Sequence, residues 1–288
     1  MNKAYGLALL TVLFWSTSAT AFKLSLKYLD VPQLLFYSSL VSTVVIAAIL
    51  RVQGRLAHVL DLERKDYINA FLLGLLNPFI YYLMIFKAYD LLPAQIAQSV
   101  NYTWAIMLTL LSVPLLKHPF GKIDFVAMLI CYTGAVIVST HGDISGFRTL
   151  SLNGLLLALG STVVWALYWI FNVRMPRDPV VGLFLNFFFS LPLTAISCIW
   201  FSSVTDISLK GFAGAVWVGC FEFGFTFVIW LTALKLSNNT GKIVNLIFLT
   251  PFVSLIFIRF FLNETVFLST FIGLAFIVSG LVLQKSSA

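Results

Sequence analysis

The segment LLGLLNPFIYYLMIFKAYDLL at residues 72–92 decides the fold of this chain. It returns in altered letters as WVGCFEFGFTFVIWLTALKLS at residues 217–237. The equivalent positions are Gly74 and Gly219, Asn77 and Glu222, Ala88 and Ala233, and, after one inserted residue, Ala105 and Pro251, and Gly134 and Gly280. Chance similarity between two apolar helices would not preserve order and spacing over several elements, so we interpret the chain as two related halves.

The composition predicts an integral membrane protein. Hydrophobic residues make up 60% of the chain, charged residues only 10%, and the mean hydropathy is +0.98. Soluble domains are only about 45–50% apolar. Apolar runs that can cross a hydrocarbon core of about 30 Å recur from end to end. We predict spans at 4–22, 32–50, 67–86, 94–116, 123–140, 153–173, 179–201, 212–234, 241–262 and 267–284.

The spans divide equally between the two halves. Residues 1–142 and 143–288 would each hold five spans, and an odd number of crossings inverts the second half relative to the first. The expected fold class is therefore an all-α membrane protein with ten transmembrane helices, built as two inverted five-helix repeats. Secondary transporters commonly use this plan, with the substrate site near the middle of the bilayer.

The basic residues predict the orientation. The net charge of +7 does not indicate a nucleic-acid partner, because the lysines and arginines lie in short loops between apolar spans. With the N-terminus inside, twelve of the eighteen fall in inner loops and tails and six fall outside. This excess predicts a multi-pass protein of the cell inner membrane with both termini in the cytoplasm. We expect the first span to be a mature helix and not a signal peptide, because no small-residue cleavage site follows it.

The sequence gives no indication of a cofactor, a metal or an enzyme. Cys131, Cys198 and Cys220 lie in three different spans without a paired spacing, and the three histidines lie in loops. No GxxxxGK[ST] motif is present, so ATP hydrolysis is not expected. We expect transport driven by a gradient, with the lipid bilayer and a small-molecule substrate as partners, and a monomer or homodimer as the assembly.

Several short motifs resemble a known family. The last two spans contain LTPF at 249–252 and LNE at 262–264, the third span ends in KAYDLLPA at 87–94, and the first contains FWS at 14–16. Together these are similar to the EamA domain of the drug/metabolite transporter superfamily, present twice. The resemblance implies ten helices as two inverted EamA repeats, and transport of a small molecule.

A narrower likeness lies in the fourth span. The run SVNYTW at 99–104 is similar to the aromatic amino-acid exporter branch of that superfamily, where Asn-Tyr-x-Trp-Pro is usual, although Ala105 replaces the proline here. The resemblance implies export of amino acids or related compounds. Two alternatives remain: an uptake carrier or exchanger for a nucleotide-like metabolite, and a membrane subunit without transport activity.

Glu222 is the first candidate site residue, because it is the acidic residue nearest the centre of a span. An ionisable group at that depth costs about 2.5 kcal/mol or more unless it faces a cavity or a partner. It could carry a proton, bind the amino group of a substrate, or be a neutral carboxyl that joins two helices. Asn77 stands at the equivalent position before Pro78, and two polar residues at equivalent depths indicate one cavity. Taken alone, Asn77 would fit interhelical hydrogen bonding.

Further candidates come from polar and aromatic faces. The fourth span carries a polar stripe at three- and four-residue steps, and the ninth carries one amide near its cytoplasmic end. Aromatic residues in spans one, three and six could wall a pocket for amphipathic or aromatic solutes, although many such residues face lipid. A proline inside the ninth span is the candidate gate. The predicted substrate-binding residues are Gln98, Asn101, Tyr102, Asn245, Trp15, Tyr82, Trp165 and Trp169, and the predicted gating residue is Pro251.

Overall fold

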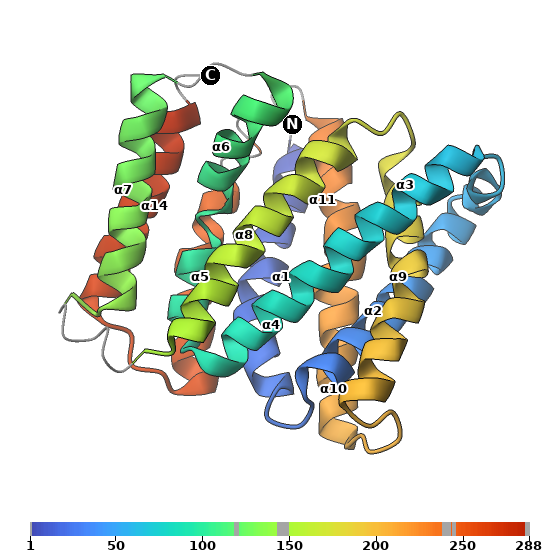
Figure 1. Cartoon of the computed structure of the whole chain (residues 1–288), viewed down its shortest axis with the longest axis horizontal. Coiled ribbons are helices and arrows are strands. Elements are labelled where there is room, and N and C mark those ends of the chain that lie inside the picture. The colour runs from blue at the N-terminus through green and yellow to red at the C-terminus, as the bar shows by residue number, and fades with distance from the viewer. Residues whose placement is uncertain (1, 118–120, 143–149, 238–242, 244–245, 286–288) are drawn as a thin grey trace. The chain divides into compact units, whose positions relative to one another are not determined.

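The computed structural model describes residues 2–117, 121–142, 150–237, 243 and 246–285, and all regular elements within these ranges are helical (Figure 1). In the first half they are α1 (Asn2–Ser25), α2 (Val31–Val52), η1 (Leu56–Val59), α3 (Arg64–Gly74), η2 (Leu75–Ile80), α4 (Tyr81–Leu91), α5 (Ala94–Asn101), α6 (Trp104–Leu116) and α7 (Lys122–Ser139). The third span thus runs through α3, η2 and α4, and the fourth through α5 and α6.

The second half repeats this order. Its helices are α8 (Leu152–Val173), α9 (Pro179–Phe201), α10 (Leu209–Trp217), η4 (Val218–Gly224), α11 (Phe225–Leu236), η5 (Leu246–Leu249), α13 (Thr250–Phe257), η6 (Ile258–Leu262) and α14 (Leu268–Lys285). Among the described residues, eight helices are long and apolar enough to cross a membrane, and two shorter apolar helices cover 246–262 and 268–283. The predicted all-helical membrane fold is confirmed. The beginning of the predicted ninth span lies outside the described residues.

The chain forms two compact units. The first unit combines Met1–Leu83 with Met175–Ser254, and the second combines Met84–Arg174 with Leu255–Ala288. Each unit therefore contains helices from both halves of the sequence, so a unit does not correspond to a single sequence repeat. The predicted division at residues 142 and 143 describes the sequence repeat and stays a prediction.

The first unit contains the same helix contact twice. A Cβ atom on Gly219 would lie 2.6 Å from the backbone oxygen of Ser38 in α2, and one on Gly74 would overlap the backbone oxygen of Asn186 in α9. The two glycines are equivalent in the repeat. Close backbone approach of this kind is how helices associate in lipid, where no hydrophobic effect drives them together. The repeat is thus visible in the packing of α3 on α9 and of α10 with η4 on α2.

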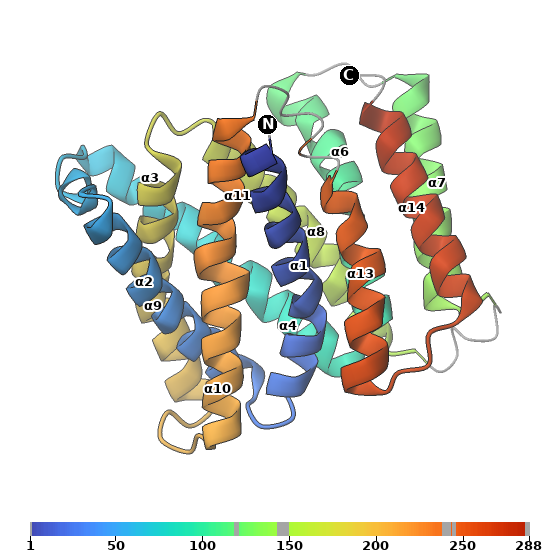
Figure 2. The same ribbon diagram turned by 180° about the vertical axis from the view of Figure 1, so that it is seen from behind.

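Both third spans are interrupted at these glycines. The π-helical turns η2 and η4 cover Leu75–Ile80 and Val218–Gly224, and Asn77 within the first has φ −143° and ψ 118°. Pro78 cannot donate a backbone hydrogen bond, which explains why the helix weakens there, as the sequence predicts. Single π-helical turns inside helices are frequent at functional sites. Each candidate polar residue, Asn77 and Glu222, therefore lies in an irregular turn. In Figure 2 the second of these spans, α10 to α11, runs beside α1.

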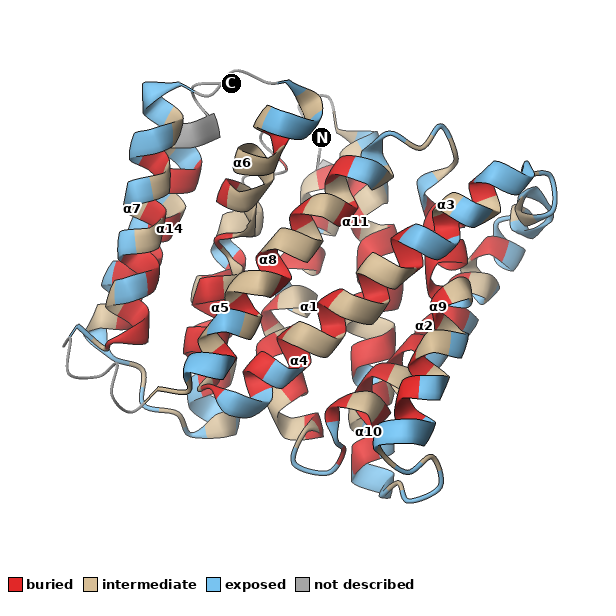
Figure 3. Ribbon diagram, viewed as in Figure 1, coloured by how far each residue is buried: buried red, intermediate tan, exposed pale blue. Residues whose placement is uncertain are grey.

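The second unit contains the last helix of each repeat. α7 and α14 pack along one another, and the equivalent glycines Gly134 and Gly280 both lie in their contact. The Cys131 thiol is buried there and donates to the Ile277 carbonyl oxygen over 3.2 Å. Figure 3 shows exposed positions along α7, and these include large apolar side chains suited to lipid. The three cysteines are free, in agreement with their unpaired spacing.

We predict that the backbone contact at Gly219 is needed for a stable fold. In Gly219→Leu the new side chain must push α2 away from η4, and overpacking of this kind usually costs about 1–3 kcal/mol. The expected result is a lower thermal unfolding midpoint in detergent, measured by fluorescence-detected size exclusion after heating. Gly6→Leu is the matched control, because nothing lies within 4 Å of a Cβ on Gly6. Equal stability of the two variants would contradict the proposed role of this contact.

Candidate functional site

The carboxyl group of Glu222 is the polar centre of the first unit. It accepts hydrogen bonds from the Ser18 hydroxyl and, over 3.0 Å, from the Tyr82 hydroxyl. The backbone carbonyl of Glu222 accepts a third bond, over 3.3 Å, from the indole nitrogen of Trp15. Side chains of α1 and α4 thus converge on η4. The structure brings together three predicted site residues, Glu222, Tyr82 and Trp15.

Aromatic rings pack against one another on the helices that contact Glu222. The Tyr82 ring centroid lies 4.2 Å from that of Phe223, which in turn lies 5.2 Å from that of Phe187 in α9. On the α1 side, the Trp15 centroid lies 5.3 Å from that of Phe227. These rings offer apolar contacts and π-faces, but they cannot neutralise a carboxylate. Within the part of the chain that the structure describes, the hydrogen bonds to Glu222 come from uncharged groups.

Glu222 has no basic partner among the described residues. The ion pairs seen there join Arg55 to Asp178, Lys65 to Glu63 and Lys87 to Asp90. A carboxylate at this depth in a span, held by two hydroxyls, leaves part of its hydrogen-bonding capacity and all of its charge uncompensated. A proton or a cationic group of a ligand would remove that imbalance. The arrangement can therefore bind a proton or an amine.

Asn77 lies at the equivalent place in the first repeat, and its environment differs. It is 1% exposed, and its Oδ1 atom has no hydrogen-bond partner among the described residues. Leaving a buried acceptor unpaired costs about 1–3 kcal/mol. A ligand donor would recover that free energy, so Asn77 remains a candidate. Asn77 follows the packing glycine Gly74 by three residues, as Glu222 follows Gly219.

The other candidates of the described chain, apart from Pro251, lie in the second unit. Gln98 is buried, and Tyr102 is half-buried at the end of α5. The Asn101 side-chain nitrogen donates to the Ser161 hydroxyl over 3.1 Å. The Trp165 ring centroid lies 5.9 Å from that of Trp169. The Trp169 indole nitrogen is buried without a partner among the described residues. These residues form a second group, and their role in binding stays a prediction.

Gln95, which precedes Gln98 by three residues in the polar stripe of the fourth span, and Glu264 both have structural contacts. Gln95 donates to the Thr265 carbonyl over 2.9 Å and accepts from the Thr270 hydroxyl over 2.7 Å. Glu264, of the LNE motif, accepts from the backbone nitrogen of Ala94 over 2.9 Å and so caps the start of α5. At its N-terminal end this polar stripe therefore serves helix packing.

The ninth span places the candidate gate in the first unit. Pro251 is buried in α13, and the preceding carbonyl, that of Thr250, accepts from the Ser16 hydroxyl over 3.1 Å. α13 is thereby tied to α1 one residue from the Trp15 contact with Glu222. The predicted site residue Asn245 lies outside the described residues.

Sequence reasoning missed Ser18. A serine inside an apolar helix is ordinary, and its partner Glu222 is 204 residues away in the sequence. The available signal was its spacing, because Ser18 follows Trp15 by three residues and so shares a helix face with it.

The comparisons with known proteins agree with this architecture. A family model described as the EamA-like transporter family matches residues 2–140 and again residues 152–284. An uncharacterized transporter of Archaeoglobus fulgidus is 23% identical over 99% of this chain and 98% of its own length. The uncharacterized transporter YvbV of Bacillus subtilis is 24% identical over 96% and 90%, and one of Clostridium kluyveri is 25% identical over 100% and 94%. One protein of known crystal structure superposes with a TM-score of 0.69 at 21% identity. The match covers 100% of this chain and 98% of that one, and it shows a shared fold.

We predict that the Tyr82 hydroxyl stabilises the protein through Glu222. Tyr82→Phe removes one of two donors to a carboxyl group, and hydrogen bonds to charged groups contribute about 1.5–3 kcal/mol. The thermal unfolding midpoint in detergent should fall by several degrees. Tyr28→Phe is the control, because Tyr28 is exposed and its ring contact with Lys210 survives the change. If both variants unfold at the wild-type temperature, the Tyr82 bond does not contribute to the site.

Proposed function

We propose an amine-transport function for this chain, which belongs to the EamA-like transporter family. The chain is a multi-pass membrane transporter. In our proposal it is a secondary transporter of the cell inner membrane with both termini in the cytoplasm. It exports amino acids or related amine-bearing metabolites by alternating access. Glu222 binds the amine or, in turn, a proton.

The observation that carries this proposal is the hydrogen-bonding state of Glu222. Its carboxyl group contacts the hydroxyls of Ser18 and Tyr82 and no basic group among the described residues. A carboxylate that lacks a cationic partner inside a span is costly, and a ligand that supplies the cation is favoured there. Amino acids and other amines carry such a group at neutral pH. A phosphate-bearing metabolite would meet repulsion at the same place.

The aromatic rings and the interrupted helices also support a site for an amine. The Tyr82 hydroxyl bonds the carboxyl group, the Tyr82 ring packs on Phe223, and the Trp15 ring bonds the backbone carbonyl of Glu222. Aromatic faces attract ammonium groups as well as apolar side chains. The turn η4 presents Glu222 in an irregular part of its span, as η2 presents Asn77. Discontinuous helices near the middle of the bilayer commonly form substrate and ion sites in secondary transporters.

We predict that Glu222→Gln lowers transport at least about tenfold without unfolding the protein. The amide keeps the shape of the side chain but cannot neutralise an ammonium group or release a proton. Losing a charged hydrogen bond of about 1.5–3 kcal/mol corresponds to a roughly tenfold or larger loss of flux. The measurement is counterflow of radiolabelled amino acids in liposomes that contain purified protein. The control is Glu63→Gln, because Glu63 is an exposed loop carboxylate paired with Lys65.

The pH profile of flux tests whether Glu222 takes part in transport. A protonatable carboxyl group makes wild-type transport vary with pH, and the glutamine variant should lose that variation along with its rate. Wild-type flux and wild-type pH dependence in Glu222→Gln would remove this residue from the mechanism.

The class of substrate can be tested by ligand stabilisation. A ligand that binds only the folded protein at 100 times its Kd adds about 2.7 kcal/mol to stability. We expect amino acids or other amines to raise the thermal midpoint of the wild-type protein and to have a smaller effect on Glu222→Gln. Nucleotides and sugar phosphates should have no effect. Stabilisation by phosphorylated compounds alone would exclude the amine proposal and favour a nucleotide-like substrate.

A further inference from the structure

α2 and α9 are equivalent helices of the two repeats, and each begins with an aspartate. Asp30 precedes α2 and accepts from the Gln33 backbone nitrogen over 2.9 Å. Asp178 precedes α9 and accepts from the backbone nitrogens of Val180 and Val181 over 2.9 and 3.1 Å. One carboxylate oxygen of each aspartate therefore caps its own helix, which is the usual role of this residue type at that place.

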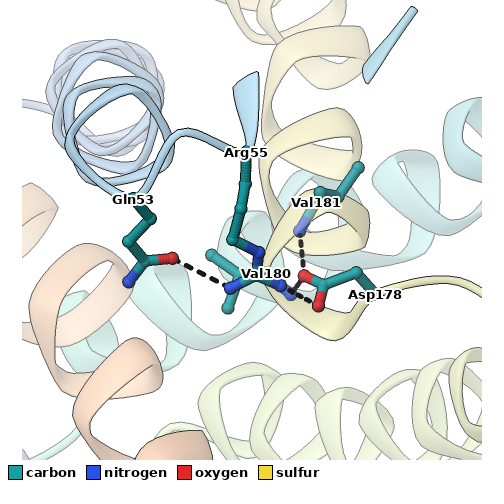
Figure 4. A network of polar contacts seen from close by, with 5 residues as sticks. All are labelled: Gln53, Arg55, Asp178, Val180 and Val181. Atoms are coloured by element: carbon teal, nitrogen blue, oxygen red, sulfur yellow. Dashed lines mark hydrogen bonds and ion pairs between the residues drawn. The ribbon is translucent and has the colours of Figure 1, made fainter. Parts of the chain in front are cut away.

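The other oxygen of each aspartate reaches the end of the opposite helix. Asp30 Oδ2 accepts from the hydroxyl of Ser202, the residue that follows α9. Asp178 Oδ2 pairs with the guanidinium of Arg55, which lies three residues beyond α2 (Figure 4). Asp30 and Asp178 are equivalent in the repeat, so the same carboxylate clamp is built twice. The two clamps lie at opposite ends of an antiparallel helix pair.

Further bonds strengthen the clamp at Asp30. The Gln33 side-chain nitrogen donates to the carbonyls of Ser203 and Asp206 over 2.8 and 2.9 Å, and the Tyr37 hydroxyl donates to the Val204 carbonyl. These donors are neutral, and all of them come from the first turns of α2. The loop that leaves α9 is thereby held against the start of α2.

The clamp at Asp178 is ionic. Arg55 also donates to the Gln53 side-chain oxygen over 2.8 Å, as Figure 4 shows. Beside it, Arg177 donates to the Asp66 carbonyl over 3.1 Å and to the Asn186 side-chain oxygen over 3.0 Å. Two arginines thus tie the start of α9 to the end of α2 and to α3. Guanidinium groups hold this end of the helix pair, whereas hydroxyl and amide donors hold the other end.

We propose that α2 and α9 form one rigid bar that stays clamped at both ends throughout the transport cycle. This inference rests on the alternating-access function proposed above. A helix pair that gates alternating access separates at one end while it is closed at the other. The α2–α9 pair is closed at both ends at once, and the two helices pack against one another. The moving contacts of the cycle therefore lie outside this pair.

Cross-linking tests the rigid bar directly. In a background with Cys131, Cys198 and Cys220 replaced by alanine, Asp30→Cys with Ser202→Cys would form a disulfide at one end. Arg55→Cys with Asp178→Cys, joined by a short bifunctional thiol reagent, would bridge the other end. The transport rate of each cross-linked protein should lie within about twofold of the rate of its reduced form. Helices that never separate during the cycle are not hindered by a cross-link between them. The single-cysteine variants treated identically are the controls.

The outcomes for the two proposals are distinguishable. Suppose that a reduced variant transports, that cross-linking at either end stops transport, and that reduction restores it. The two helices must then separate during the cycle, and the rigid-bar proposal is wrong. If the wild-type protein moves no amine at all, the proposed function fails instead. A second measurement leaves the clamps intact. Spin labels are attached at exposed positions in two pairs, Val52 with Pro179 and Lys27 with Phe201, and the distance within each pair is measured. Their distances should not change when substrate is added, and a shift at one end would equally overturn the inference.

Discussion

The first unit depends on two backbone contacts, Gly219 against Ser38 and Gly74 against Asn186. In lipid, helices gain nothing from burying apolar surface, so the distance of closest approach determines how well they pack. A side chain at either glycine would separate the third span of one repeat from the second span of the other. Glu222 and Asn77 follow these glycines by three residues each. The contact that holds the helices together thus also fixes where the two polar groups lie.

Sequence equivalence does not give equivalent chemistry. Glu222 has two hydroxyl donors and an indole bonded to its carbonyl, whereas the Asn77 side-chain oxygen has no partner among the described residues. The same asymmetry recurs at the helix starts, where Asp178 meets Arg55 and Asp30 meets the Ser202 hydroxyl. A duplicated scaffold therefore carries different charges at its equivalent positions. Such differences allow one half to bind a charged group while the other supplies an uncharged surface.

Hydropathy, spacing and turn residues were enough to predict most of the fold. The apolar runs give the spans, and Pro78 marks the interruption of the third, because these effects act along a local stretch of chain. The partners of the site residues could not be predicted in the same way. Ser18 and Glu222 are joined across 204 residues, and an aspartate before a helix looks like a cap whether or not its second oxygen binds elsewhere. Long-range pairs need the register between helices, which a single sequence does not reveal.

The rigidity of α2 and α9 has a consequence for binding at Glu222. η4 packs on α2 through Gly219 and Gly224, so the turn that carries Glu222 rests on the clamped pair. A binding group held by a stiff support loses little entropy when it meets a ligand, and its hydrogen bonds are already oriented. The elements that contribute Ser18 and Tyr82 are α1 and α4, which the clamps do not restrain. A transporter has to release what it binds, and separating a fixed carboxylate from movable hydroxyl donors provides a way to weaken the site.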